Sequence, residues 1–198
     1  MRGMPPIPLP PPRPAGPVSL EEALRRRRSR RDFSGAPLSL ADLGQLLWAA
    51  HGVTSPDARR TAPTAGNTQP HEVYAVTPAG TFRYAGAAHH MEEVDPADLR
   101  APLRAVTRDD DHLLLAGAVI VLAAVTARTA GRYPERADRY VALGLGHAAQ
   151  NVLLQAEALG LAAYPVGAHD LEGVARLLRL PEGCVPFYMV PVGHPAAG

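Results

Sequence analysis

The sequence predicts an α+β fold. Helical and strand patterns are mixed along the 198 residues, without the regular strand-helix-strand alternation that a doubly wound parallel sheet requires. Hydrophobic residues make up 46% of the chain, which suffices for one compact domain or for a thin subunit that completes its core by oligomerising. A continuous β-rich run at 118–125 is typical of a strand that is buried on both faces, and we expect it to be central in the sheet.

The N-terminal segment is rich in proline. Eight of the first seventeen residues are proline, and because proline fixes φ and lacks an N–H, the stretch 5–17 is excluded from helices and central strands. We expect an extended arm over residues 1–18, followed by a domain over 19–198. The arm is either a disordered tail or a segment that lies across a neighbouring subunit, and neither alternative indicates a function.

Two helices are predicted from serine caps. Ser19 is followed by Glu22, and Ser39 by Asp42, which is the spacing of a capping box in both cases. The first helix leads into a run of arginines. The second helix carries leucine and alanine on one face and ends at Gly52, so we expect it to pack against the core.

A hairpin and a further helix come before the central strand. Polar and apolar residues alternate over 72–77, a Pro-Ala-Gly turn follows, and the chain returns over 81–84. The segment 95–103 opens on Asp-Pro and is predicted to be a helix.

The C-terminal half begins with the longest helical pattern. Over 136–159 apolar residues recur every three or four positions, and Gly160 follows as a stop. A short strand at 164–167, a helix at 170–178 capped by its first aspartate, and a last strand at 186–192 complete the predicted elements.

Charge and composition exclude several functions. A net charge of +1 gives no support for binding to nucleic acid or to a membrane surface, and either role would need a local basic patch. All twenty basic residues are arginine, which excludes catalysis by a Schiff-base lysine, a lysine general base or a P-loop lysine. The histidines lack metal-binding spacing, so we expect no metal site. The single cysteine, Cys184, and the absence of an apolar export or membrane-spanning segment predict a cytoplasmic protein.

The arginine run at 25–31 is the first segment that can carry chemistry. Six arginines surround Ser29, and in an extended segment Arg27, Ser29 and Arg31 point to the same side because side chains alternate. Two guanidinium groups and a hydroxyl then converge on one anion, for which a phosphate monoester is suited. The alternative is a solvated basic run or a nucleic-acid patch.

Two further segments bring backbone close to a ligand. The loop 62–70 contains small residues and Asn67, whose amide both donates and accepts, and its alternative is a plain turn before a strand. The segment 165–168, Pro-Val-Gly-Ala, presents successive N–H groups without a bulky side chain, and its alternative is a strand end without a function.

The order and spacing of these segments are more specific than any one of them, and they extend over about residues 19–195. In chain order the motifs are Arg27-x-Ser29-x-Arg31 with Phe33, Ser39-Leu40, Leu46-Leu47-Trp48-Ala49-Ala50, Pro63-Thr64-Ala65-Gly66-Asn67, Arg139-Tyr140, Gly146-His147-Ala148-Ala149-Gln150-Asn151, Gly160-Leu161-Ala162-Ala163-Tyr164-Pro165-Val166-Gly167 and Pro191-Val192-Gly193. This pattern resembles the flavin-dependent nitroreductase superfamily, and within it the SagB-type dehydrogenase branch.

The resemblance implies an α+β sandwich with a central, mostly antiparallel sheet, an obligate homodimer, and one FMN per active site at the subunit interface. It implies that the arginine segment holds the phosphate, that the 63–67 loop reaches the flavin from the partner chain, and that Gly167 and Ala168 present N–H groups to the N5 and O4 edge. The cofactor-binding residues implied in this way are Arg27, Arg28, Ser29, Arg31, Pro63, Thr64, Asn67, Pro165, Val166, Gly167 and Ala168.

Two features depart from the family pattern. Many members end with a basic pair that reaches the phosphate, whereas this sequence ends Gly-His-Pro-Ala-Ala-Gly. Azoline-oxidising members carry a Lys-Tyr pair where this chain has Arg132-Tyr133. Because an arginine keeps its proton near neutral pH, Tyr133 is the remaining candidate for a proton acceptor or relay.

The resemblance implies an FMN-dependent oxidoreductase that transfers hydride, with NAD(P)H as a candidate donor. Because no separate dinucleotide fingerprint is present, NAD(P)H would bind where the second substrate binds later, which predicts a ping-pong mechanism. Two substrate classes stay open, which are the azoline of a modified peptide, oxidised to an azole, and small molecules such as nitroaromatics or quinones, which are reduced. The alternatives of another class are a nucleic-acid-binding module that uses the 25–31 run and a catalytically silent flavin-binding partner subunit.

Overall fold

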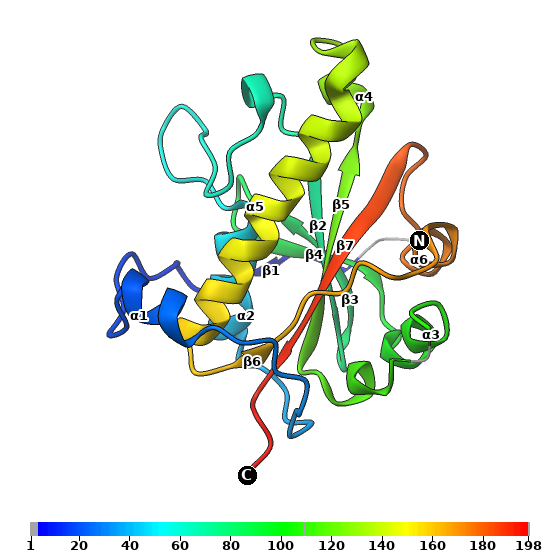
Figure 1. Ribbon diagram of the computed structural model, residues 1–198. Helices are drawn as coiled ribbons and strands as arrows, with labels where there is room; N and C mark the ends of the chain where they lie inside the picture. Colours follow the sequence, from blue (N-terminus) through cyan, green and yellow to red (C-terminus); the bar gives the residue numbers. More distant parts are fainter. Residues whose placement is uncertain (1–3, 109, 198) are drawn as a thin grey trace.

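The computed structural model describes residues 4–108 and 110–197, which form one seven-stranded sheet with helices on both faces (Figure 1). The strands are β1 (Ile7–Pro8), β2 (His71–Thr77), β3 (Gly80–Ala85), β4 (His90–Asp95), β5 (Ala118–Val125), β6 (Ala162–Ala163) and β7 (Cys184–Gly193). The helices are α1 (Leu20–Arg26), α2 (Leu40–His51), α3 (Arg100–Ala105), α4 (Ala127–Ala130), α5 (Ala137–Ala158) and α6 (Leu171–Leu177), with 3₁₀ turns at Ala65–Asn67, Asp111–Leu115 and Pro134–Arg136.

The sheet has the order β1-β4-β3-β2-β5-β7-β6, and all of its strand pairs are antiparallel. The predicted α+β class is therefore confirmed. The hairpin of β2 and β3 is confirmed too, with Thr77 opposite Gly80 at its turn. Strand β5 lies between β2 and β7, and seven of its eight residues are buried, which explains its unbroken apolar sequence.

Alternate residues of the central strands enter two separate cores. Val73 and Ile120 face the side that α2 and α5 cover, whereas Tyr74 and Val121 face the side of α3 and α6. This alternation follows from the period of two in a β-strand. Figure 1 shows α5 crossing the sheet on the first of these faces.

The N-terminal segment packs against its own chain. Ile7 pairs with Met91 of β4, and Leu9 is 7% exposed within the core beside α2. Gly44 of α2 makes room for this contact, since a Cβ there would stand 3.3 Å from the Leu9 side chain. Arg13 then donates its N–H to Gln45 Oε1 at 2.8 Å. Within one chain, residues 7–13 thus contribute to the core and to the sheet edge.

Local capping chemistry fixes the helix starts as predicted. Ser19 accepts a hydrogen bond from the Glu22 N–H, and Ser39 accepts one from the Asp42 N–H. The long helix is confirmed as α5. None of the helices in the described ranges is long and apolar enough to cross a membrane.

Two sequence predictions of local structure are wrong. The helix expected from Asp95 begins only at Arg100, because Asp95 ends β4 and its carboxylate accepts from the Ala97 N–H at 2.9 Å in the turn that follows. The strand expected over 164–167 is instead β6, which is two residues long. Pro165 has no N–H with which to continue it, and only Val166 returns to pair with Met189.

Candidate active site

The arginine segment follows α1 and lies along the free edge of the sheet. The Arg27 N–H closes α1 by donating to the Ala23 carbonyl. The Arg30 N–H donates to the Ala163 carbonyl of β6 at 3.0 Å, and its guanidinium lies 3.6 Å from the Glu157 carboxylate of α5. These contacts hold the segment in place without using Ser29 or Arg31.

A cavity of about 500 Å³ opens beside this segment. Its lining consists of Ser29, Arg30, Arg31, Asp32, His112, Pro195 and Ala196. The end of the chain closes one side of it, because the Ala196 N–H donates to the Asp32 carbonyl at 3.0 Å. The C-terminal segment therefore reaches the arginines even though it carries no basic pair.

The structure brings only two of the four predicted arginine-segment residues into this cavity. Ser29 and Arg31 line it, whereas Arg27 and Arg28 do not. The Arg28 guanidinium turns back and donates to the carbonyls of Arg25 and Arg27, at 3.0 and 2.8 Å. The strict alternation expected for Arg27, Ser29 and Arg31 is absent, since Arg27 still belongs to the end of α1.

Arg31 is held by an aromatic ring. Its guanidinium carbon lies 4.9 Å from the centre of the Tyr164 ring, a cation–π contact. The Tyr164 hydroxyl donates to Asp110 at 2.7 Å, and burial together with this hydrogen bond raises the pKa of Tyr164. Neither Arg31 nor Arg27 forms an ion pair with any carboxylate among the described residues. Sequence reasoning missed Tyr164 and Asp110 as supports because no local pattern marks them.

The segment 165–168 offers backbone donors at the surface. Val166 exchanges two hydrogen bonds with Met189 of β7, at 2.8 and 3.0 Å, and so fixes the segment. Gly167 and Ala168 are exposed, and in the part of the chain that is described their N–H groups have no acceptor. Pro165 and Val166 position the segment, and the two residues after them present free N–H groups.

The loop 63–67 lies on the other side of the molecule from the arginine cavity, against α5. Pro63 and Thr64 line a cavity of about 280 Å³ together with residues of α5. Asn67 has a positive φ of 54° and accepts a hydrogen bond from the Gln69 side chain at 3.3 Å. Pro63 and Thr64 thus share one cavity, and Asn67 does not line it.

Tyr133 covers this loop. Its ring meets the ring of Tyr140 edge to face at 5.2 Å, and the Arg132 guanidinium donates to the Gly66 carbonyl at 3.1 Å. A Cβ at Gly66 would stand 2.8 Å from the Tyr133 hydroxyl, and Gly66 has a φ of +57°. Glycine is therefore required at this position, and the predicted proton-handling residue lies directly on the predicted flavin loop.

The predicted residues of one chain thus form groups at opposite ends of α5. Tyr133 and the 63–67 loop lie toward its N-terminal end, while the arginine segment lies beside β6, which follows its C-terminal end (Figure 1). A helix of 22 residues is about 33 Å long at 1.5 Å per residue. Pro63 and Thr64 lie beside Gly144 and His147, whereas Arg30 lies beside Glu157, so the two groups contact different stretches of α5.

Comparison with known proteins gives concordant matches. The model of the nitroreductase family matches residues 24–194. A protein of Methanocaldococcus jannaschii that bears the name nitroreductase is 33% identical over 183 residues, which cover 89% of this chain and 91% of that protein. A solved structure from Ralstonia eutropha, also named a nitroreductase, superimposes with a TM-score of 0.87 at 31% identity and covers 100% of this chain and 97% of its own.

A more distant structure shares the fold. The NADPH:FMN oxidoreductase of Vibrio harveyi, complexed with NAD⁺, has a TM-score of 0.67 at 22% identity, over 90% of this chain and 69% of that one. The family match and the close relatives extend over nearly the whole chain, and on this evidence the protein belongs to the nitroreductase family, whose members are FMN-dependent oxidoreductases.

Proposed function

We propose that the protein binds FMN with its phosphate in the Ser29–Arg31 cavity and uses it to transfer hydride between two substrates in turn. The observation that carries this proposal is the guanidinium of Arg31. It is held over the Tyr164 ring, has no carboxylate partner among the described residues, and shares a cavity with the Ser29 hydroxyl. A phosphate would supply the missing negative charge through charge-assisted hydrogen bonds.

The residues present fit FMN. Ser29 and Arg31 would donate to the phosphate, and Arg27, which is also free of ion pairs within the described ranges, would add positive charge. The unused N–H groups of Gly167 and Ala168 are suited to the N5 and O4 edge of the ring, where they would stabilise negative charge. When bound, FMN supplies the hydride chemistry, and the chain positions it and tunes it.

A second copy of the chain completes this site in our proposal. The outward face of α5 carries Leu143, which is 52% exposed, and Gly146, where a Cβ would have no neighbour within 4 Å. A two-fold axis that places two α5 helices against each other would bring the 63–67 loop of one chain toward the arginine segment of the other. Pro63, Thr64 and Asn67 would then approach the flavin from the partner subunit.

NAD(P)H is the proposed electron donor, and it would alternate with the second substrate at one site. The fold of this chain is shared by the Vibrio harveyi oxidoreductase, whose structure holds NAD⁺. The second substrate belongs either to the small nitroaromatics and quinones or to the azoline-containing peptides of the SagB-type branch. A cytoplasmic location, expected from the single cysteine, is part of the same proposal.

The arginine run itself argues against the alternative of a nucleic-acid module. Arg25 and Arg26 both pair with Glu22, and Arg28 is turned onto backbone carbonyls. Three guanidinium groups of the run are therefore held by contacts within the chain, which favours a structural role for this part of it.

The proposal is tested by chromatography with in-line absorbance and light scattering. The purified protein is expected to elute yellow, with twice the mass of the 21.0 kDa chain, and NADH or NADPH is expected to bleach the flavin until an oxidant restores it. A colourless protein after incubation with FMN, or a flavin-bound monomer at micromolar concentration, contradicts the site as we propose it. A flavin that binds but is never reduced identifies the silent partner subunit instead.

Tyr133→Phe tests the proposed proton relay. If the Tyr133 hydroxyl relays the proton of the azoline to water, accepting it while releasing its own, its removal should lower kcat by roughly 100-fold or more while FMN content is unchanged. Tyr140→Phe is the matched control, because it removes a hydroxyl from the ring that packs against Tyr133. Full azoline oxidation by the Tyr133→Phe protein would assign the Arg132-Tyr133 pair a purely structural role.

A further inference from the structure

A third cavity, of about 310 Å³, lies at the start of β2 where the end of α2 and the 60–69 loop meet the sheet. Three arginines, one glutamate and two buried histidines are among its lining residues, and none of them is predicted to bind FMN. Those used below are His51, Arg60, His71, Glu72, Arg83 and Arg128.

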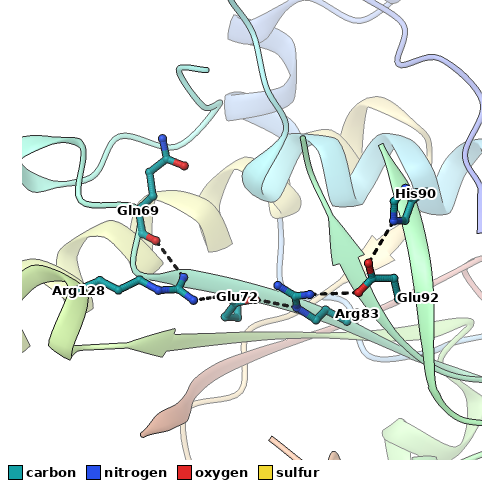
Figure 2. A network of polar contacts seen from close by, with 6 residues as sticks. All are labelled: Gln69, Glu72, Arg83, His90, Glu92 and Arg128. Atoms are coloured by element: carbon teal, nitrogen blue, oxygen red, sulfur yellow. Dashed lines mark hydrogen bonds and ion pairs between the residues drawn. The ribbon is translucent and has the colours of Figure 1, made fainter. Parts of the chain in front are cut away.

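Most of the charge in this cavity is compensated within the chain. Figure 2 shows the buried Glu72 between two guanidinium groups, with Arg83 Nε at 3.0 Å and Arg128 Nη2 at 2.7 Å from its two carboxylate oxygens. Arg83 Nη1 also lies 3.1 Å from a carboxylate oxygen of Glu92, and the other oxygen of Glu92 contacts His90 Nε2. Two arginines and two glutamates therefore neutralise each other along this network.

Arg60 is the exception. Its Nη1 donates to the His51 carbonyl at 3.1 Å, and its Nε and Nη2 donate to Gln69 Oε1 at 3.2 Å. All of these acceptors are neutral, and Arg60 forms no ion pair with any carboxylate that the structure describes. The side chain is half-buried, and this burial lowers the pKa of the Arg60 guanidinium. The cavity thus holds one positive charge in excess, with guanidinium hydrogens still unused.

Two buried imidazoles border the same cavity. His51 is 7% exposed and His71 is 3% exposed, and their ring centres are 5.3 Å apart. Nδ1 of both rings and Nε2 of His71 have no hydrogen-bond partner among the described residues. These nitrogens are themselves buried, and His71 Nε2 lies against Gly144 of α5, so the two rings border the cavity without offering these atoms to a ligand.

We propose that this cavity binds the carboxylate of a small organic anion, with Arg60 as its cationic partner and the His51 and His71 rings beside it. A single excess charge matches a monoanion, and the planar guanidinium matches two carboxylate oxygens. A phosphate dianion would leave a negative charge in excess beside Glu72. The volume is at the lower end of those of small-molecule pockets, which fits a ligand of few atoms.

The proposed anion site does not depend on the proposed FMN site, although a path of hydrogen bonds connects the two sites. Gln69 accepts from Arg60 and donates through Nε2 to Asn67 Oδ1 at 3.3 Å. An anion on Arg60 would therefore lie next to the residue that holds one end of the 63–67 loop.

The test is a titration of the purified FMN-treated protein with sodium acetate in a buffer free of other carboxylates, followed by calorimetry and by the ring signals of the histidines in NMR. Saturable binding is expected, with His51 and His71 as the signals that shift. Arg60→Gln should weaken acetate binding about tenfold or more. Arg59→Gln is the matched control, because its exposed side chain pairs with Asp57 and does not line the cavity, and it should bind acetate as the wild type does.

Three outcomes would overturn the assignment. These are the absence of saturable acetate binding with unshifted histidine signals in the wild type, equal affinity in the Arg60→Gln and wild-type proteins, and tighter binding of inorganic phosphate than of acetate. The wild-type NMR titration decides the question even where Arg60→Gln fails to fold. Arg60→Lys provides a second variant. It keeps the positive charge but loses the planar guanidinium that can donate to both carboxylate oxygens, so it should bind acetate with intermediate affinity.

Discussion

The double variant Arg27→Ala, Arg31→Ala is expected to bind FMN at least about 100-fold more weakly than the wild type. Each charge-assisted hydrogen bond contributes about 1.5 to 3 kcal/mol, and two guanidinium groups are removed. Arg31 lines the cavity beside Ser29, whereas Arg27 closes α1 and does not line it. Of the two single variants, Arg31→Ala should therefore show the larger loss.

Equilibrium dialysis or quenching of flavin fluorescence measures this affinity. The matched control is Arg25→Ala, Arg26→Ala, which removes the same charge from the same run but only breaks ion pairs with Glu22. A loss of affinity as large in the control as in the test variant would mean that the run acts through its overall charge. Unchanged affinity for FMN in the test variant would mean that the phosphate of FMN binds in another cavity.

Acidification is expected to destabilise the fold well above the pH at which carboxylates titrate. Burial, followed by the neighbouring His71 and arginines, lowers the pKa of His51 to about 3, and burial with the nearby His147 lowers that of His71 to about 4. In the unfolded chain both imidazoles titrate near 6.5, so below that pH the unfolded state binds protons that the folded state does not bind. The contribution of the two neutral histidines to the free energy of unfolding is complete above pH 6.5 and is lost as the pH falls toward 4.

The size of this effect follows from the two shifts. Each group contributes up to about 1.4 kcal/mol per pH unit, so the free energy of unfolding should fall by about 3 kcal/mol between pH 6.5 and 5. That is a large part of the stability of an ordinary domain, which is about 5 to 15 kcal/mol. Urea unfolding at half-unit steps of pH measures the slope.

A variant with both His51→Gln and His71→Gln should have a nearly flat profile over this range, even where its stability at pH 7 is lower. His112→Gln is the control, because its side chain is exposed, and it should keep the wild-type slope. If the wild-type slope survives in the double variant, protonation of other groups causes the acid sensitivity.

The parts of the fold that could be predicted are those fixed by neighbouring residues. Serine caps, a continuous apolar strand and a long amphipathic helix each depend on local chemistry, and α1, α2, β5 and α5 lie where they were expected. Strand β4 was missed because His90, Glu92 and Glu93 give it a polar composition typical of a loop. It is a strand because it pairs with β3 on one side and with β1 on the other.

The candidate site could be predicted only in segments. The arginine run, the 63–67 loop and the 165–168 segment were each visible as motifs. The supports of these segments are residues far away in the sequence. The Tyr164 ring lies under the Arg31 guanidinium, and the Tyr133 hydroxyl lies beside Gly66. No local pattern encodes such pairs, and the cavity of Arg60 was missed for the same reason, because its charge balance exists only once β2 and β3 align Glu72 with Arg83.

The two residues of β1 have a consequence for aggregation. Without them, β4 would present a free row of N–H and carbonyl groups on which another chain could extend the sheet. Strand β1 pairs with His90 and Met91 at the start of that row and is itself a poor template, because Pro6, Pro8 and Pro10 cannot donate hydrogen bonds to a further strand. The proline-rich segment therefore makes this end of the sheet a poor template for a strand of another chain. A protein shortened beyond Leu9 is expected to expose the edge of β4 there and to aggregate at high concentration.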